Sequence, residues 1–251
     1  QEGVQEVSNG SFSQEGSELI TNGDFATDSD WTTTTNTTIT NNKAEFINAI
    51  SNSDFIQQSI AAPSGKFYKL QLDVSNLGDG ESIKIRFPFQ DTSITTNGTH
   101  TIYKKGEDSN FLRITPNSAT ATFSIDNVSV KEVGQDWISP DNAIDFSNNS
   151  VTINGGTGNR RLSQTNVTSP VSSQWKLQYE ITDKVGTSDL RLYTTNSGSA
   201  AYTIIPSTVG VHTFYFNTSS SSIYFNFNNG VGSVSITNIS VKEVGQNWTL
   251  G

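Results

Sequence analysis

The two histidines, His100 and His212, are the side chains best suited to acid–base chemistry near neutral pH. They begin the similar segments HTIY and HTFY, so they occupy equivalent positions in two parts of the chain. General acid–base catalysis also requires a suitably placed acid, base or nucleophile. The sequence contains no nucleophile elbow, no phosphate-binding loop, no metal-type spacing of His, Asp and Glu, and no cysteine. We therefore predict no catalytic residues and no enzyme activity, with both histidines as hydrogen-bonded strand residues.

Aromatic and amide side chains in the second half of the chain could instead bind a carbohydrate. A sugar ring stacks its apolar face on an aromatic side chain, while amide and charged groups bind its hydroxyls. The alternation of apolar residues places several such side chains opposite the predicted core: Tyr193, Tyr215, Tyr224, Gln178 and Asn226. We take these residues as the first candidate glycan-binding set.

The matching positions of the first half are more basic and would suit an acidic glycan. They comprise Arg86, Tyr103 and Arg113, with Lys69, Gln71 and Lys84 nearby. In both halves the alternative interpretation is that these side chains form the solvated face of an antiparallel sheet or contact a neighbouring subunit.

Composition argues against several other partners. Only 15 Lys and Arg stand against 24 Asp and Glu, a net charge of -9, so the chain lacks the basic surface that nucleic-acid binding requires. No apolar stretch approaches the ~18 residues of a membrane span, so we predict neither nucleic-acid binding nor membrane insertion. Ser, Thr and Asn make up 90 of the 251 residues, a composition that favours a β-protein with many turns.

An internal duplication determines how these residues are arranged. Residues 124–137 and 235–248 are identical at 11 of 14 positions. The earlier segments 68–74 and 175–181 correspond in the same order and at nearly the same spacing. The chain therefore contains two copies of one module, and each copy fills a little less than half of the sequence.

Each copy has the pattern of an all-β module. Apolar and polar residues alternate through 68–74 and 175–181, as in half-buried strands, and no window shows a helical period. Further strands are expected at 83–87, 100–105, 111–115 and 120–131. The alternation reverses within the last strand of each copy, which predicts a β-bulge or sheet switch at Asn127 and Asn238. We predict two tandem β-sandwich domains of the jelly-roll or immunoglobulin-like type.

Two motifs give the duplicated module a family resemblance. The segment ELITNGDF, followed by a tryptophan and, near the end of the copy, by FSIDNVSV, resembles the jelly-roll carbohydrate-binding modules of families four and nine. The ending SVKEVGQ, followed directly by another module, is similar to tandem modules of bacteriophage virion proteins such as tail fibres and capsid-attached fibres. The resemblance spans nearly all of residues 18–251 and implies modules that bind or support rather than catalyse.

The resemblance also implies a structural calcium ion in the first module. Matched by position, Gly23 would supply a carbonyl oxygen and Asp126 a carboxylate, with Asp24, Asp28 or Asp30 as candidates for a further carboxylate. Calcium takes six to eight oxygen ligands, so this set alone is incomplete. Ala26 stands where the family has a ligating glutamate, and Thr237 replaces the aspartate in the second copy, so no second site is expected. The alternative is that residues 27–30 form a solvated turn.

The repeat predicts the domain boundaries. Residues 1–17 are expected to be a linker or upstream tail, 18–136 the first β-sandwich module, 137–247 the second, and 248–251 the start of a further module or a tail. Three of the four tryptophans, Trp31, Trp137 and Trp248, each lie near the start of a copy. In addition, VSNGSF at 7–12 echoes ITNGDF at 20–25.

The resulting hypothesis is a non-enzymatic structural and adhesive component of a phage virion appendage, located on the virion and able to bind host-surface polysaccharide. Its partners would be other virion subunits, with a homotrimer expected from the resemblance alone. The alternative is the carbohydrate-binding region of a secreted or cell-surface bacterial polysaccharide-degrading enzyme. In that case a catalytic domain would lie beyond the two modules.

Overall fold

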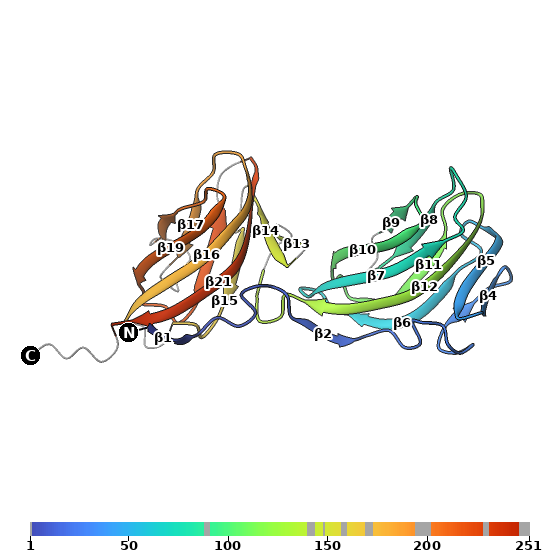
Figure 1. The fold of residues 1–251 in the computed structure, drawn as a ribbon, viewed down its shortest axis with the longest axis horizontal. Helices are drawn as coiled ribbons and strands as arrows, with labels where there is room; N and C mark the ends of the chain where they lie inside the picture. Colours follow the sequence, from blue (N-terminus) through green and yellow to red (C-terminus); the bar gives the residue numbers. More distant parts are fainter. Residues whose placement is uncertain are drawn as a thin grey trace, which may run out of the picture. The chain divides into compact units, whose positions relative to one another are not determined.

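Strands account for all of the regular secondary structure that is described (Figure 1). The computed structural model describes residues 2–87, 91–139, 144–147, 149–156, 160–168, 173–193, 202–227 and 231–245. Within these ranges no helix is long and apolar enough to cross a membrane. The chain divides into two compact units, module one (Glu15–Val133) and module two (Gln1–Gln14 with Gly134–Gly251). Each is built from two antiparallel sheets, which confirms the predicted all-β class with two β-sandwich modules.

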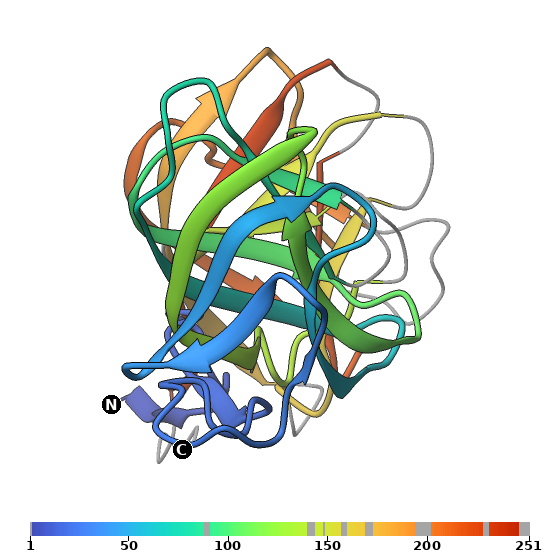
Figure 2. The ribbon, with the colours of Figure 1, turned by 90° about the vertical axis from the view of Figure 1, so that its right-hand side faces the viewer.

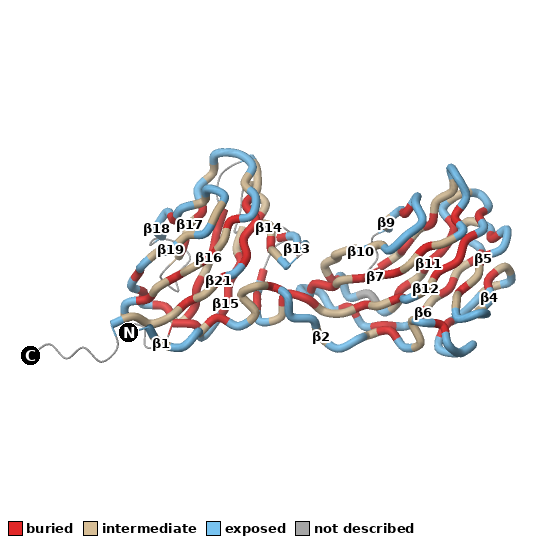
Figure 3. Tube along the Cα trace, in the orientation of Figure 1, coloured by how far each residue is buried: buried red, intermediate tan, exposed pale blue. Residues whose placement is uncertain are grey.

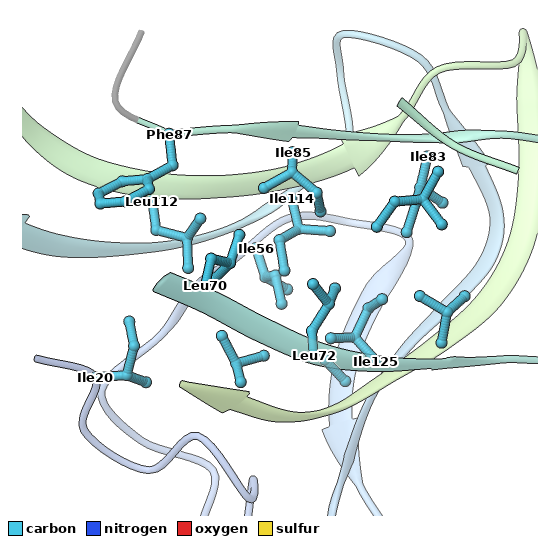
Figure 4. Packing of buried hydrophobic residues seen from close by; sticks show 14 of the residues in the cluster. Ile20, Ile56, Leu70, Leu72, Ile83, Ile85, Phe87, Leu112, Ile114 and Ile125 are labelled. Atoms are coloured by element: carbon cyan, nitrogen blue, oxygen red, sulfur yellow. The ribbon is translucent and has the colours of Figure 1, made fainter. Parts of the chain in front are cut away.

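Module one has one sheet in the order β10-β7-β12-β5-β4, with β2 paired to β12, and a second sheet in the order β3-β6-β11-β8-β9. Figure 2 views this module with β4 and β5, in blue, nearest the reader. Alternate apolar residues of the strands, such as Leu70, Leu72 and Ile85, form its core (Figure 4). The strand bounds are β2 (Glu15–Glu18), β3 (Thr32–Thr33), β4 (Thr37–Thr40), β5 (Lys43–Ile50), β6 (Ile56–Ala62), β7 (Phe67–Ser75), β8 (Ile83–Arg86), β9 (Asp91–Ile94), β10 (Gly98–Lys105), β11 (Ser109–Pro116) and β12 (Thr120–Val133).

Module two repeats this arrangement. One sheet has the order β13-β14-β21-β16-β19, with β1 paired to β21, and the other has the order β15-β20-β17-β18. The strand bounds are β1 (Glu2–Gln5), β13 (Ile144–Ser147), β14 (Ser150–Asn154), β15 (Arg161–Gln164), β16 (Gln174–Val185), β17 (Leu190–Tyr193), β18 (Tyr202–Ile205), β19 (Gly210–Asn217), β20 (Ile223–Phe227) and β21 (Ser233–Val244). Strand β16 of this module corresponds to β7 of module one, and β21 corresponds to β12.

The period-two pattern of the sequence is also the burial pattern of the strands (Figure 3). Along β16, Trp175, Leu177, Tyr179 and Ile181 are buried, whereas the intervening Lys176, Gln178 and Glu180 are partly exposed. Successive side chains of a strand point to opposite faces of the sheet, so one set enters the core and the other faces outward. The outward set is the one from which a ligand-binding face can be built.

The reversal of alternation in the last strand of each copy is a β-bulge, as predicted. The pairing of β12 with β7 shifts register between Asp126 and Ser129, and the pairing of β21 with β16 shifts at the corresponding place. Asn127 and Asn238 have φ angles of 50° and 51°, in the left-handed region that asparagine tolerates better than most residues. The extra residue returns the apolar side chains to the buried face.

The N-terminal residues belong to module two, so the boundaries differ from those expected. The sequence predicts a linker or tail at 1–17, but Glu2–Gln5 is a strand paired with β21 of module two, and Glu15–Glu18 is a strand paired with β12 of module one. Module one is therefore inserted between the first strand of module two and the rest of that module. The expected further start at 248–251 lies outside the described residues.

The two Asn-Gly turns dock on their modules with the same contacts. The indole Nε1 of Trp31 donates a hydrogen bond to the carbonyl oxygen of Asn22 over 3.0 Å, and that of Trp137 donates to the carbonyl oxygen of Asn9 over 3.1 Å. Each tryptophan also packs against the phenylalanine three positions after its asparagine, with ring centroids 5.2 and 5.3 Å apart. Residues 7–12, whose sequence is similar to that of residues 20–25, therefore form the first turn of module two.

Candidate ligand-binding face of module two

Tyrosines from three neighbouring strands form a row across the smaller sheet of module two. Tyr193 of β17 is the direct cross-strand partner of both Tyr224 of β20 and Tyr202 of β18. The rings of Tyr193 and Tyr202 are 5.5 Å apart between centroids and are tilted by 42°. Directly opposed residues point to the same side of a sheet, so the three rings share one face.

A second row, rich in donors and acceptors, runs beside the tyrosines. Asn226 of β20 is the cross-strand partner of Arg161 of β15 and of Arg191 of β17. The Arg191 guanidinium lies 4.2 Å from the ring centroid of Tyr202, and that of Arg161 lies 5.8 Å from the ring centroid of Tyr224. We call the set Arg161, Arg191, Tyr193, Tyr202, Tyr224 and Asn226 the tyrosine face.

Simple alternation explains why the sequence presents these side chains together. In β17, Leu190 and Leu192 are buried, and Arg191 lies between them on the opposite side. In β20, Ile223 and Phe225 are buried, so Tyr224 faces the other side of the sheet. The apolar residues that anchor the sheet to the core therefore determine which polar residues gather on its outer surface.

Two buried polar atoms of the tyrosine face have no hydrogen-bond partner among the described residues. They are Oδ1 of Asn226, whose residue is only 3% exposed, and Nε of Arg191. A buried polar atom without a partner destabilises the fold by about 1–3 kcal/mol. Such atoms are unusual in native proteins, and a bound ligand or water is one common explanation. The face therefore has unused hydrogen-bonding capacity.

The predicted glycan-binding residues of the second half are distributed over two different sheets. Tyr193, Tyr224 and Asn226 meet on the tyrosine face. Gln178 and Tyr215 instead lie on β16 and β19 of the other sheet, where Gln178 donates to Thr213 over 3.4 Å. The alternation of apolar and polar residues shows which side of a strand faces outward, but it does not show which sheet contains the strand.

Three members of the tyrosine face are absent from the sequence-based set: Arg161, Arg191 and Tyr202. Arg191 lies next to Tyr193 on β17 between two buried leucines, and that signal could have identified it as outward-facing. Arg161 and Tyr202 lie on β15 and β18, whose sequences RLSQ and YTII do not alternate clearly between apolar and polar residues. Their place on the face follows from sheet pairing.

The matching sheet of module one carries a different surface. Arg113 and Arg86 are cross-strand partners, but Arg86 forms two hydrogen bonds of 2.8 and 3.1 Å with Asp91. These bonds hold the pKa of Asp91 below its ordinary value. Arg113 donates to Gln57 over 2.8 Å and lies over the ring of Phe55. These cations are already engaged within the sheet, so this face offers an acidic glycan less than the sequence suggested.

The other basic and aromatic candidates of module one lie mainly on its larger sheet. Tyr103 is on β10, opposite Lys69 of β7. Lys69 forms a 2.7 Å ion pair with Glu15, and Lys84 of the smaller sheet lies 3.7 Å from Asp91. The predicted basic set is thus divided between two sheets, and its lysines are neutralised by carboxylates.

Module one contains a polar cleft of about 310 Å³. It is lined by Leu19, Thr21, Asp30, Thr32, Gln57, Gln58 and Ser59. The amide of the buried Gln58 already exchanges two hydrogen bonds with the backbone of Thr21. The cleft is therefore a consequence of how the first turn docks.

The residues proposed for calcium have hydrogen-bond partners within the protein. The carbonyl oxygen of Gly23 accepts from the backbone N–H of Val128 over 2.8 Å, and a carboxylate oxygen of Asp126 accepts from the next backbone N–H over 2.7 Å. A carboxylate oxygen of Asp24 lies 3.4 Å from the backbone nitrogen of Ala26. Across the described residues, no group of three or more His, Asp or Glu is arranged to hold a metal ion.

Each histidine contacts a backbone carbonyl oxygen in the segment just before its own strand. Nε2 of His100 lies 2.9 Å from the carbonyl oxygen of Thr96, and Nε2 of His212 lies 2.6 Å from that of Thr208. This repeated contact joins the start of each strand to the preceding turn. The pair is an equivalent structural feature of the two modules.

No protein-family model matches the chain. No curated protein matches it either. Among solved structures, the CBM22-1–CBM22-2 tandem domain of Xyn10C from Paenibacillus barcinonensis is similar over 92% of this chain and 99% of its own length, with 8% identity and a TM-score of 0.33. The tandem CBM51 modules of a family 98 glycoside hydrolase from Streptococcus pneumoniae are similar over 92% and 97%, with 6% identity and a TM-score of 0.28.

A triple jelly-roll structure from an archaeal virus is similar over 86% of this chain and 59% of its own length, with 12% identity and a TM-score of 0.24. At these TM-scores none of the three likenesses bears on the ligand of this chain. The candidate site therefore depends on its own geometry.

Proposed function

We propose that the chain is a non-enzymatic carbohydrate-binding segment whose site is the tyrosine face of module two. The observation that carries this proposal is the row of Tyr202, Tyr193 and Tyr224 across three strands, flanked by buried polar atoms without partners among the described residues. Aromatic rings on a rigid sheet bind the apolar face of a sugar with little loss of side-chain freedom. Adjacent amide and guanidinium groups would orient its hydroxyls.

Module one would serve a different purpose in this proposal. Within its described residues the matching face has no tyrosine row, and its charged side chains bind one another or the sheet. We therefore assign module one to spacing or assembly and module two to ligand binding.

For the biological setting, we propose an extracellular appendage of a phage virion that attaches to host-surface polysaccharide. The sequence motifs support this setting, together with other virion subunits as partners in a homo-oligomer such as a trimer. The alternative remains a carbohydrate-binding region of a secreted or cell-surface polysaccharide-degrading enzyme. The complete gene product discriminates between them, because a catalytic domain favours the second setting and a virion-anchoring segment favours the first.

The direct test is binding of the full chain to a panel of bacterial and marine polysaccharides, with and without calcium. The test variant is Tyr193→Ala/Tyr224→Ala. The matched control is Tyr215→Ala, which removes a 55% exposed tyrosine from the other sheet of the same module. We expect the double variant to lose at least about tenfold in affinity, equivalent to about 1.4 kcal/mol, and the control to bind normally.

Two outcomes would contradict the proposal. Equal losses in the double variant and in Tyr215→Ala would place the site elsewhere on module two. Absence of binding across the panel, with both modules folded by circular dichroism, would leave the modules as spacers or assembly surfaces.

A further inference from the structure

We infer that the ligand of the tyrosine face is an acidic sugar, one that carries a carboxylate or sulfate group beside its hydroxyls. This inference rests on the proposed function and specifies the class of glycan. It begins from Arg161 and Arg191, the two cations that flank Asn226 on this face.

Several cations of the two modules are neutralised by carboxylates within the protein. Glu15 forms ion pairs of 2.7 and 3.0 Å with Lys69 and Lys131 in module one. In module two, Glu2 plays the same part toward the equivalent lysines of β16 and β21. One carboxylate thus serves two cations at corresponding positions of both modules.

Arg161 and Arg191 lack such a carboxylate partner among the described residues. The guanidinium of Arg161 lies over the ring of Tyr224, and that of Arg191 lies over the ring of Tyr202. A guanidinium over a tyrosine ring is only weakly stabilised, and the ring does not neutralise its charge. An anion that approaches this face would therefore meet two cations without having to displace a carboxylate.

The spacing of the two arginines suits one sugar residue. They lie on strands separated by β20, so their backbones are about 9–10 Å apart, twice the distance between neighbouring strands. Asn226 lies between them in the same row. A sugar ring stacked on Tyr193 or Tyr224 could then place its acidic group beside one guanidinium and its hydroxyls toward the amide.

The unpartnered atoms favour a hydroxyl-bearing ligand. Nε of Arg191 can only donate a hydrogen bond, and Oδ1 of Asn226 can only accept one. A sugar hydroxyl both donates and accepts, so a single hydroxyl between the two side chains would satisfy both atoms. Because both atoms are buried, this contact requires the Arg191 side chain to turn away from Tyr202 as the ligand enters.

Non-specific attraction cannot account for such binding. The chain carries a net charge of -9 and so repels a polyanion as a whole. Affinity for an acidic glycan would have to come from a local site where cations are concentrated. The tyrosine face is such a site, since its cations have no carboxylate partner among the described residues.

The experiment uses the full chain and pairs of probes that differ in charge. Polygalacturonate is compared with its methyl ester, and dextran sulfate with dextran, so carboxylate and sulfate are tested separately. The test variant is Arg161→Gln/Arg191→Gln, with Arg86→Gln/Arg113→Gln of module one as the matched control. Arg191→Lys keeps the charge but removes the planar fork of donors.

We expect binding to at least one charged probe that is about tenfold or more tighter than to its neutral counterpart. The test variant should remove this difference, and Arg191→Lys should retain part of it. The module-one control should leave it unchanged, and about 0.5 M salt should weaken it through screening.

Each contrary result has a distinct meaning. Equal affinity for charged and neutral probes, unaffected by the arginine variant, would overturn the acidic-sugar inference while leaving carbohydrate binding intact. Loss of binding in the module-one control would place the anion site on the other module and overturn the inference. Absence of binding to every polysaccharide would overturn the inference together with the proposed function.

Discussion

Glu15 and Val133, the first and last residues of module one, are direct cross-strand partners in the pairing of β2 with β12. Glu2 and Val244 are partners in the same way in the pairing of β1 with β21 of module two. A module whose two ends lie side by side can be inserted into a loop of another domain with little strain. This relationship explains how module one interrupts module two without disturbing its sandwich.

Module one is therefore expected to fold alone, and module two should fold once the insertion is removed. The first protein would contain residues 15–133, and the second would join Gln14 to Gly134 through a short Gly/Ser linker. We expect cooperative thermal unfolding of each, since every described strand of a module finds its partners within that module. Residues 134–251 without residues 1–14 are the control and should unfold at a lower temperature. An unfolded 15–133 protein would contradict the assignment.

The glycines of the two Asn-Gly turns should not tolerate a side chain. A Cβ on Gly23 would lie 1.9 Å from the carbonyl oxygen of Val128, and one on Gly10 would lie equally close to that of Ile239. We expect Gly23→Ala to destabilise module one by about 2–3 kcal/mol. In Gly23→Ala, hydrogen exchange should show a loss of amide protection in module one alone. In Gly10→Ala, amide protection should fall only in module two.

Gly78→Ala is the control for these glycine variants. Its Cβ would meet only the far end of the Glu81 side chain, so little loss of protection is expected. An equal loss in Gly23→Ala and Gly78→Ala would show that chain flexibility, rather than the close approach to Val128, determines the effect.

Buried glutamines should be essential for holding the first turn of each module. The amide of Gln58 accepts from the N–H of Thr21 and donates to its carbonyl oxygen, both over 2.8 Å. Gln164 does the same for Ser8 over 2.8 and 2.9 Å. Replacing Gln58 with leucine leaves two backbone groups without these partners, so we expect a loss of about 2–4 kcal/mol by urea unfolding of module one. Gln71→Leu, at a partly exposed position of β7 in the same module, is the control, and comparable losses in the two variants would refute the prediction.

Acid should destabilise module one through Asp54. Burial raises the pKa of this carboxyl, but hydrogen bonds from the backbone N–H of Ile50 and from Asn36 together outweigh that effect, so the pKa lies below its ordinary value. A depressed pKa in the folded state contributes stability above the unfolded pKa of about 4, and this contribution is lost as the pH falls through the folded value. Asp54→Asn should lower stability at neutral pH and flatten the profile below a pH of about 4. A profile identical to that of the parent would argue against this role.

Local patterns determined much of this protein. Alternation in 68–74 and 175–181 identified strands and their buried faces, because side-chain direction in a strand has a period of two. The reversal of parity identified the bulges at Asn127 and Asn238, because the apolar side chains must return to the core. The repeat identified two equivalent modules, and the echo at residues 7–12 contained the clue to the first turn of module two.

Tertiary structure alone decided which of these elements meet. Residues 1–14 belong to module two because β1 pairs with β21, a contact between segments far apart in the sequence that no local pattern records. In the same way, strand pairing places Tyr193 and Tyr224 beside Tyr202 on one sheet. Tyr215 also faces outward, but it lies on the other sheet. Parity is a property of one strand, whereas a binding face is a property of several strands held side by side by hydrogen bonds and a common core.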